Sequence, residues 1–169
     1  MAAFAIMAGV FALVLAGYVF AMLRRRARLR EAAADLGGVH QHDGWTRPGG
    51  IGGPGFTIRV EGPRRRFRTT VSVTAQAPGN YVIDSAFFAS PLDWSHVEPA
   101  DGAQREALAR WLEPGASTHR IHEDRLAAAG ISRIFVASER ISTSVDGILT
   151  DAARLRQIID VLSRLAGPR

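Results

Sequence analysis

The chain has 169 residues, a net charge of +5 and no cysteine. The absence of cysteine excludes disulfides, thiolate metal sites and a thiol nucleophile. All 21 basic residues are arginine, so the chain has no lysine for a P-loop or a Schiff base.

Residues 1–23 contain no charged side chain, and five arginines follow within the next seven positions. A helix of this length spans roughly 34 Å, which is enough to cross the hydrocarbon core of a membrane. A cleaved signal peptide is the alternative, but its basic stretch would precede the apolar run, and no Ala-x-Ala site closes the run. The sequence therefore predicts a retained transmembrane helix over residues 1–23.

The arginines after this segment predict its orientation, because basic flanks stay on the cytoplasmic side. We expect the N-terminus outside and everything from Arg24 onward in the cytoplasm. The exclusive use of arginine indicates a GC-rich bacterial genome, so the expected location is a bacterial inner membrane. The side chains expected to contact anionic lipid headgroups or an acidic partner are Arg24, Arg25, Arg26 and Arg28.

Small residues recur at four-residue spacing within the apolar segment. Such rows let a second helix approach closely, and packing drives helix association in lipid. The alternative is that alanine and glycine are simply common in transmembrane helices. The residues expected to pack against partner helices are Ala8, Gly9, Ala12, Ala16 and Gly17.

Residues 24–38 are predicted to continue the helix as a basic juxtamembrane stalk, which ends at Gly37-Gly38. Residues 39–55 are rich in glycine and predict a linker without a packed core. This linker contains Gly50-x-Gly52-x-x-Gly55, the spacing of a dinucleotide fingerprint. No strand is expected before it and a strand rather than a helix is expected after it, so we assign it no nucleotide.

Residues 56–169 are predicted to form one cytoplasmic domain. Alternating apolar residues predict strands over 56–61, 66–75, 81–88, 131–137 and 140–145. Helical spacing predicts helices over 103–112 and 123–129, and a last helix that Thr150 or Asp151 caps and that ends at Gly167-Pro168. Because the strands look like hairpins, the expected fold class is α+β, with an antiparallel sheet of about five strands and two or three helices on one face.

The turn between the first two of these strands is strongly basic. Arginine-rich turns bind phosphate headgroups, acidic protein faces or nucleic acid, and a merely solvated turn is the alternative. Residues 24–68 carry a net charge of +7 and residues 69–169 carry −2, which argues against a nucleic-acid partner. We expect lipid or acidic-partner contacts from Arg64, Arg65, Arg66 and Arg68.

No group of residues predicts catalysis, a metal or a cofactor. His119 and His122 share a helical face but lack a third ligand. His40 and His42 lie in the predicted linker, where nothing holds a geometry. The loop around Asp93, Ser95 and His96 has the residue types of a catalytic triad, yet such triads assemble from separate segments. Trp94 in that loop and Trp45 in the linker are better explained as docking anchors, because tryptophan is enriched at binding hot spots.

The chain has an N-terminal span, a basic stalk, a glycine-rich linker and a small domain that ends in an amphipathic helix after Val145-Asp-Gly-Ile-Leu149. This order of elements resembles that of uncharacterised bacterial single-pass membrane-anchored proteins with a small C-terminal α+β domain. The resemblance implies no activity, and no functional residue is carried over from it.

The sequence favours a non-enzymatic accessory or scaffold subunit that stabilises a larger integral membrane complex, for instance a photosynthetic or respiratory one, without a cofactor of its own. The first alternative is a membrane-tethered ligand-binding or sensory domain with an apolar pocket lined by Tyr81, Phe87, Phe88 or Trp111. The second is a hydrolase that uses His96 or His119.

Overall fold

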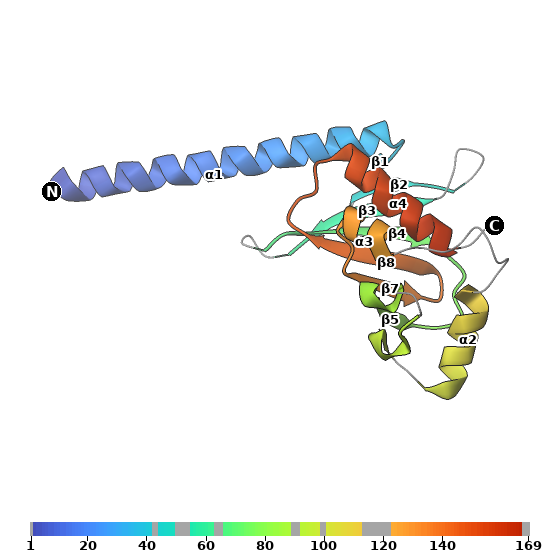
Figure 1. The fold of residues 1–169 in the computed structure, drawn as a ribbon. Coiled ribbons are helices and arrows are strands. Elements are labelled where there is room, and N and C mark those ends of the chain that lie inside the picture. The colour runs from blue at the N-terminus through green and yellow to red at the C-terminus, as the bar shows by residue number, and fades with distance from the viewer. Residues whose placement is uncertain are drawn as a thin grey trace.

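A long helix, α1 (Ala2–Asp35), projects from a domain that contains one antiparallel sheet (Figure 1). The computed structural model describes residues 2–41, 44–49, 55–62, 66–88, 92–98, 101–112 and 123–166, without the side chains of residues 2–5 and 123. Among these residues the sheet has eight strands in the order β1-β2-β3-β4-β8-β7-β5-β6. The strands are β1 (Val39–Gln41), β2 (Gly44–Arg47), β3 (Phe56–Glu61), β4 (Arg68–Thr74), β5 (Tyr81–Asp84), β6 (Val97–Glu98), β7 (Arg133–Ala137) and β8 (Arg140–Asp146).

The expected α+β class is confirmed, but the expected number of strands is wrong. The five predicted strands correspond to β3, β4, β5, β7 and β8, and the sequence analysis misses β1, β2 and β6. These three have two to four residues each, too few to display a periodic apolar pattern, and they exist because a neighbouring strand pairs with their backbone. The third predicted strand is also shorter than expected, because Ser85–Phe88 forms a 3-10 helix, η1.

The central strands have one covered and one open face. In β4 the covered face carries Thr69, Val71 and Val73, which are buried. The open face of the described sheet is rich in hydroxyl groups, and one row of register partners crosses most of its strands. That row consists of Thr46, Thr57, Ser72, Ser142, Phe135, Val82 and Glu98.

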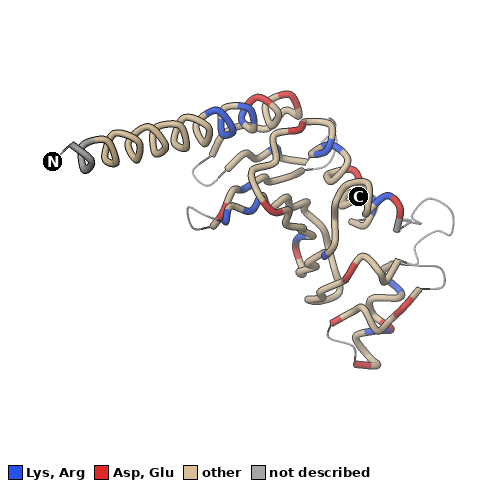
Figure 2. The backbone as a smooth tube through the Cα atoms, turned by 60° about the vertical axis from the view of Figure 1, so that its left-hand side comes forward, with Lys and Arg blue, Asp and Glu red and all other residues tan. Residues whose placement is uncertain are grey.

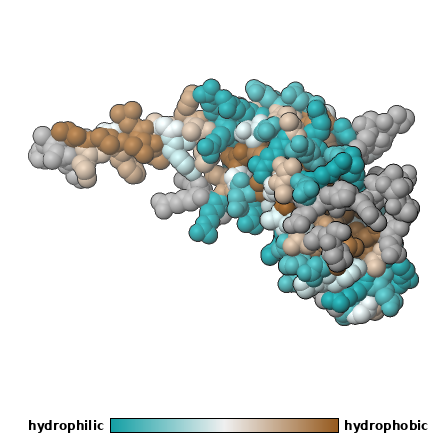
Figure 3. Space-filling view, viewed as in Figure 1, coloured by the Kyte–Doolittle hydropathy of each residue, from teal (hydrophilic) through white to brown (hydrophobic). Residues whose placement is uncertain are grey.

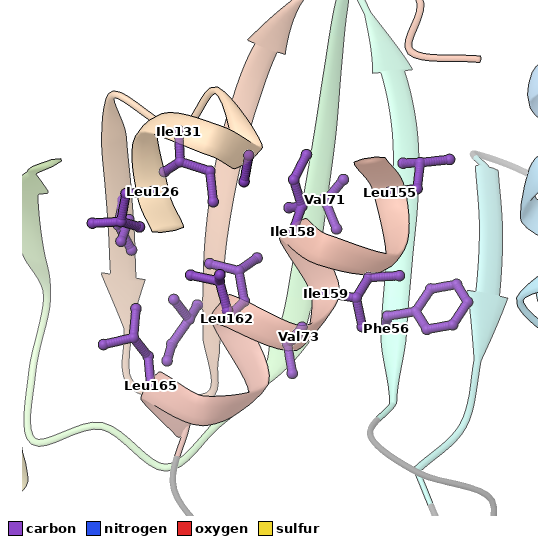
Figure 4. Packing of buried hydrophobic residues seen from close by; sticks show 14 of the residues in the cluster. Phe56, Val71, Val73, Leu126, Ile131, Leu155, Ile158, Ile159, Leu162 and Leu165 are labelled. Carbon is purple, nitrogen blue, oxygen red and sulfur yellow. The ribbon is translucent and has the colours of Figure 1, made fainter. Parts of the chain in front are cut away.

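Helix α4 (Ala152–Ala166) packs across the covered face, as Figure 4 shows. Asp151 caps its first turn, since the Asp151 carboxylate accepts hydrogen bonds from the backbone nitrogens of Ala153 and Arg154 at 2.9 and 3.3 Å. The apolar stripe predicted from helical spacing supplies the core. Its fully or nearly fully buried members are Leu155, Ile158, Ile159, Val161, Leu162 and Leu165.

The two shorter predicted helices are also present. They are α2 (Gly102–Leu112), capped by Asp101 through a 2.8 Å hydrogen bond from the nitrogen of Gln104, and α3 (Glu123–Ala129). Helix α3 packs against α4, and its end at Gly130 has the positive φ of 68° that a glycine C-cap adopts. Helix α4 packs on β4 and β8, and α3 packs on α4.

The C-terminal end of α1 belongs to the domain core. Leu29, Ala32, Ala33 and Leu36 are buried, and α1 contacts α4. The helix ends as predicted, because the nitrogens of Gly37 and Gly38 donate to the carbonyl oxygens of Ala34 and Ala33, both at 2.8 Å. The predicted stalk over residues 24–38 is thus not a spacer, since its apolar side packs beneath the sheet.

The predicted linker over residues 39–55 contains two strands where it is described. Arg47 of β2 donates from its Nη1 to the carbonyl oxygen of Leu36 at 3.1 Å. Its guanidinium also lies 5.1 Å from the centre of the Phe56 ring. These contacts hold the segment against the end of α1, so an ordered edge of the sheet replaces the expected flexible connection. Residues 50–54, with most of the fingerprint glycines, lie outside the described residues.

Tyr81 makes the stability of this fold depend on pH. Its side chain is buried, and its hydroxyl donates to the carbonyl oxygen of Gln104 at 3.2 Å. Burial raises the pKa of Tyr81 above its ordinary value, and the negative charge of Asp101 raises it further. The phenol therefore resists ionisation more in the folded chain than in the unfolded chain. This contribution is complete below about pH 10 and is lost as the pH rises through the folded pKa.

We expect Tyr81→Phe to lower the free energy of unfolding by about 1 kcal/mol at pH 7, because one hydrogen bond is lost. The variant should also lose less stability than the wild type between about pH 9 and pH 12, since it lacks the titrating phenol. Urea unfolding in detergent, followed by tryptophan fluorescence, measures both effects. Identical pH profiles for the two proteins would contradict this account.

Candidate membrane-proximal site

The first half of α1 is an exposed apolar rod. Apart from Met22, which is partly buried, the large side chains from Ile6 to Leu23 have exposed fractions between 43% and 76%, and Figure 3 shows this apolar stretch projecting beyond the polar surface of the domain. Exposed apolar surface of this extent marks an interaction site. Among the described residues, α1 is the one helix long and apolar enough to cross a membrane.

The predicted small-residue rows lie on this exposed rod. A Cβ atom added at Gly9 or Gly17 would meet nothing within 4 Å, so the chain itself does not occupy this face. At 3.6 residues per turn, Phe11 and Tyr18 lie on roughly the opposite side of the helix from Gly9. The exposed small residues are Ala8, Gly9, Ala12, Ala16 and Gly17.

The opposite side of α1 faces the β3–β4 hairpin. An open cavity of about 1180 Å³ separates them, lined by Phe11 and Tyr18 on the helix and by Arg66 and Arg68 on the hairpin side. In Figure 1 this hairpin points along α1 toward the N-terminal end of the helix. The hairpin therefore reaches toward the side from which the apolar rod projects.

The basic residues of the two segments are close to each other. The guanidinium of Arg26 lies 6.0 Å from the centre of the Phe67 ring, at the edge of cation–π range. Arg68 forms an exposed pair with Asp146, with Nε and Oδ1 3.4 Å apart. Arg66 is exposed, whereas Arg64 and Arg65 lie outside the described residues. Figure 2 shows that positive charge gathers where α1 meets the domain; Arg24, Arg25, Arg26, Arg28 and Arg30 are all exposed there.

A second cavity, of about 830 Å³, lies between α1 and the first three strands. Arg26 and Arg30 line it from the helix, and Trp45 and Arg59 line it from the sheet. His40 of β1 packs edge-on against Trp45 with ring centres 5.5 Å apart. We call this space the α1–β3 cavity. Trp45, expected as a docking anchor, thus lines an open cavity between α1 and the sheet and is only partly exposed.

The sequence does not predict the α1–β3 cavity, because the residues that line it come from three segments that were expected to be a stalk, a linker and a domain. Arg30 and Arg59 are not among the residues expected to contact lipid or a partner, and His40 was expected to lie in a flexible linker. No local motif joins these positions. The alternation of β3, which places Val60 on the same face as the core residue Ile58, is a signal that could have drawn attention to this side of the sheet.

Trp94, the other expected anchor, packs onto the domain. Its ring meets Phe87 edge-on, with ring centres 5.0 Å apart, and Phe87 is fully buried. Of the expected pocket aromatics, Tyr81 and Phe87 are core residues, and none of the cavities described here is lined by them. Trp94 is half-buried and contributes one face to this aromatic cluster.

The triad-like residues beside Trp94 form a helix cap. The Asp93 carboxylate accepts hydrogen bonds from the hydroxyl and the nitrogen of Ser95, at 2.7 and 3.0 Å, at the start of η2 (Trp94–His96). These bonds, and then the nearby His96, hold the pKa of Asp93 below its ordinary value. The His96 Nε2 lies 3.5 Å from the same carboxylate. Asp93 therefore lies between Ser95 and His96, whereas a catalytic triad needs the histidine between the acid and the serine.

His119 and His122 lie outside the described residues. In the part of the chain that the structure describes, no three potential metal ligands come together.

No protein-family model, curated protein or solved structure matches this chain. Its function is therefore inferred from the chemistry and geometry of these surfaces.

Proposed function

We propose that this protein is a non-enzymatic, membrane-anchored accessory subunit that holds a cytoplasmic domain in a set orientation beside an integral membrane complex. One observation carries the proposal. The helix that exposes its apolar half at residues 6–23 is the same uninterrupted helix whose last turns, around Leu29 and Ala33, are buried in the domain.

This continuity supports a scaffold rather than a tethered, freely moving domain. A flexible linker would let the domain sample many orientations. Here the rod and the core share one backbone, and α1 packs against α4. A domain held in this way presents a constant face to a neighbour in the membrane, which suits a stabilising subunit.

The arginines after Leu23 support a cytoplasmic domain in a bacterial inner membrane, because basic flanks remain on that side. The exposed arginines of α1 and of the β3–β4 hairpin then lie beside anionic headgroups or an acidic partner. The small-residue face around Gly9 and Ala12 is the surface proposed for the partner helix. It suits that role because close backbone approach drives association in lipid.

Substitution of Gly9 tests the partner contact. We expect Gly9→Leu to remove most of the co-purification with larger membrane proteins in mild detergent, because the added side chain prevents close helix approach. Val14→Leu, on roughly the opposite side of α1, is the matched control and should leave co-purification unchanged. A wild-type chain that elutes from native membranes as a monodisperse monomer would overturn the proposed function.

A further inference from the structure

Two residues that line the α1–β3 cavity have buried donors without an acceptor among the described residues. The indole Nε1 of Trp45 and the Nε of Arg59 are both buried, and neither has a hydrogen-bond partner among the described residues. Both residues line the cavity, Trp45 from the face of the sheet that α1 covers. Arg59 alternates with the buried Ile58, so its side chain leaves β3 on the other face, where it also lines a cavity with Thr46 and Thr57. Buried polar groups in proteins are almost always hydrogen-bonded, so these two call for a partner that the described chain does not supply. Indole and guanidinium nitrogens only donate, so that partner is an acceptor.

The charge around the cavity specifies the acceptor further. Arg26, Arg30 and Arg59 line it, against the single carboxylate of Glu61. An excess of arginine favours an anion, and the planar guanidinium fork matches the oxygens of a phosphate. The volume of about 830 Å³ exceeds what a bare phosphate ion fills and falls in the range of sites for small organic ligands. A phosphate ester with an attached polar group suits this space.

The position of the cavity along α1 indicates where such an ester comes from. At a rise of about 1.5 Å per residue, Arg26 lies roughly 4.5 Å and Arg30 roughly 10.5 Å beyond Leu23, the last apolar residue of the rod. The headgroup layer extends about 5–8 Å beyond the hydrocarbon core. The cavity therefore begins at the depth of lipid phosphates. Trp45 adds the amphipathic ring that is enriched at this depth.

We propose that the α1–β3 cavity binds a phosphate group carried by an anionic phospholipid headgroup of the inner leaflet. Arg26 and Arg30 hold the phosphate from the helix, while Trp45 donates to one of its oxygens from the sheet. The inference rests on the membrane anchoring in the proposed function. It differs from a diffuse attraction between arginines and lipid, because a defined cavity with unpaired donors selects one lipid molecule.

The test uses the full chain in detergent, titrated with phosphatidylglycerol or with phosphatidylcholine. Native mass spectrometry counts the lipids bound and gives the dissociation constant. We expect one phosphatidylglycerol to bind in preference to phosphatidylcholine. Arg30→Gln should weaken this binding about tenfold, because a charge-assisted hydrogen bond is lost. Trp45→Phe should weaken it severalfold, because the ring remains but its donor is removed.

Arg28→Gln is the matched control. It removes the same charge from the same exposed stretch of helix, but Arg28 does not line the cavity. Arg28 contributes only diffuse attraction to the lipid surface, so a clearly smaller loss of phosphatidylglycerol binding in Arg28→Gln than in Arg30→Gln supports the cavity. Equal weakening by Arg28→Gln and Arg30→Gln would show a diffuse electrostatic effect and overturn the proposal. Arg30 is exposed in α1, so its substitution is not expected to prevent folding.

A second titration with inorganic phosphate separates the two sources of the ligand. Weak binding of free phosphate, compared with phosphatidylglycerol, supports the lipid. Tight binding of inorganic phosphate that is independent of lipid and sensitive to Arg30→Gln would overturn the lipid source. If Arg30→Gln reduces co-purification with membrane proteins and leaves lipid binding unchanged, the cavity takes a protein carboxylate and the proposal is wrong.

These outcomes are distinct from those that test the proposed function. A chain that co-purifies with membrane proteins but shows no selective lipid binding overturns only the lipid site. A chain that binds phosphatidylglycerol selectively but is isolated as a monomer overturns only the accessory role.

Discussion

Leu29→Ala is expected to lower the free energy of unfolding of the domain by about 3 kcal/mol, because it empties a fully buried position and leaves a cavity. Leu29 has no exposed surface, although it lies only six residues after the apolar rod. Its side chain packs where α1 enters the core with Ala32, Ala33 and Leu36. Urea unfolding of the full chain in detergent, followed by tryptophan fluorescence, measures the change.

Leu23→Ala is the control for this substitution. The side chain of Leu23 is 61% exposed, so its truncation should leave the unfolding free energy of the domain nearly unchanged. Equal stability of the Leu29→Ala variant and the wild type would show that α1 does not contribute to the core.

Leu29→Ala should also loosen the orientation of the apolar part of α1 relative to the domain. Because the chain has no cysteine, two introduced cysteines at exposed positions 28 and 140 can carry spin labels without background labelling. We expect a narrow distribution of label distances in the wild-type background and a broader one with Leu29→Ala. A broad distribution in both would contradict the rigid connection on which the scaffold role depends.

Thr69→Val is expected to destabilise the domain by about 3 kcal/mol. The Thr69 hydroxyl is fully buried, donates to the carbonyl oxygen of Gly147 at 2.8 Å and accepts from the nitrogen of Leu149 at 2.9 Å. Valine has nearly the same shape, so the change removes this partner from the buried nitrogen of Leu149 and from the partly buried carbonyl oxygen of Gly147. A buried group without a partner costs about 1–3 kcal/mol. Thermal unfolding followed by circular dichroism measures the loss.

Thr69→Ser separates the hydroxyl from the methyl group. Serine keeps both hydrogen bonds and leaves only a methyl-sized void, so we expect a loss of about 1 kcal/mol. If valine proves less damaging than serine at position 69, the hydroxyl does not hold the β8–α4 connection in place.

For Thr69 the sequence predicts burial but not the hydrogen-bond partners. The alternation of β4 correctly places Thr69 on the covered face with Val71 and Val73. A buried threonine needs a partner, but Gly147 and Leu149 are about 80 residues away along the chain. Only the pairing of β4 with β8 brings them together.

The arginines that follow Leu23 and those of the β3–β4 hairpin show the same limit of prediction from sequence. Their composition is evident in the sequence, and the apolar run identifies the rod. Their proximity is not evident, because it depends on the β3–β4 hairpin running beside α1 and on Arg26 reaching Phe67. Arg30 and Trp45 line one cavity for a similar reason, since β2 pairs with β3 in a register that no local pattern predicts.

The sequence by itself determined the elements whose stability is local or periodic. These are the apolar rod of α1, the glycine end of that helix, the stripe of α4 and the alternation of β3 and β4. Each depends on residues within a few positions of one another, so spacing alone reveals it. Only the tertiary structure decided that the basic stalk enters the core and that the glycine-rich segment forms a sheet edge. Both outcomes depend on side chains and backbone groups that meet only after distant segments pack together.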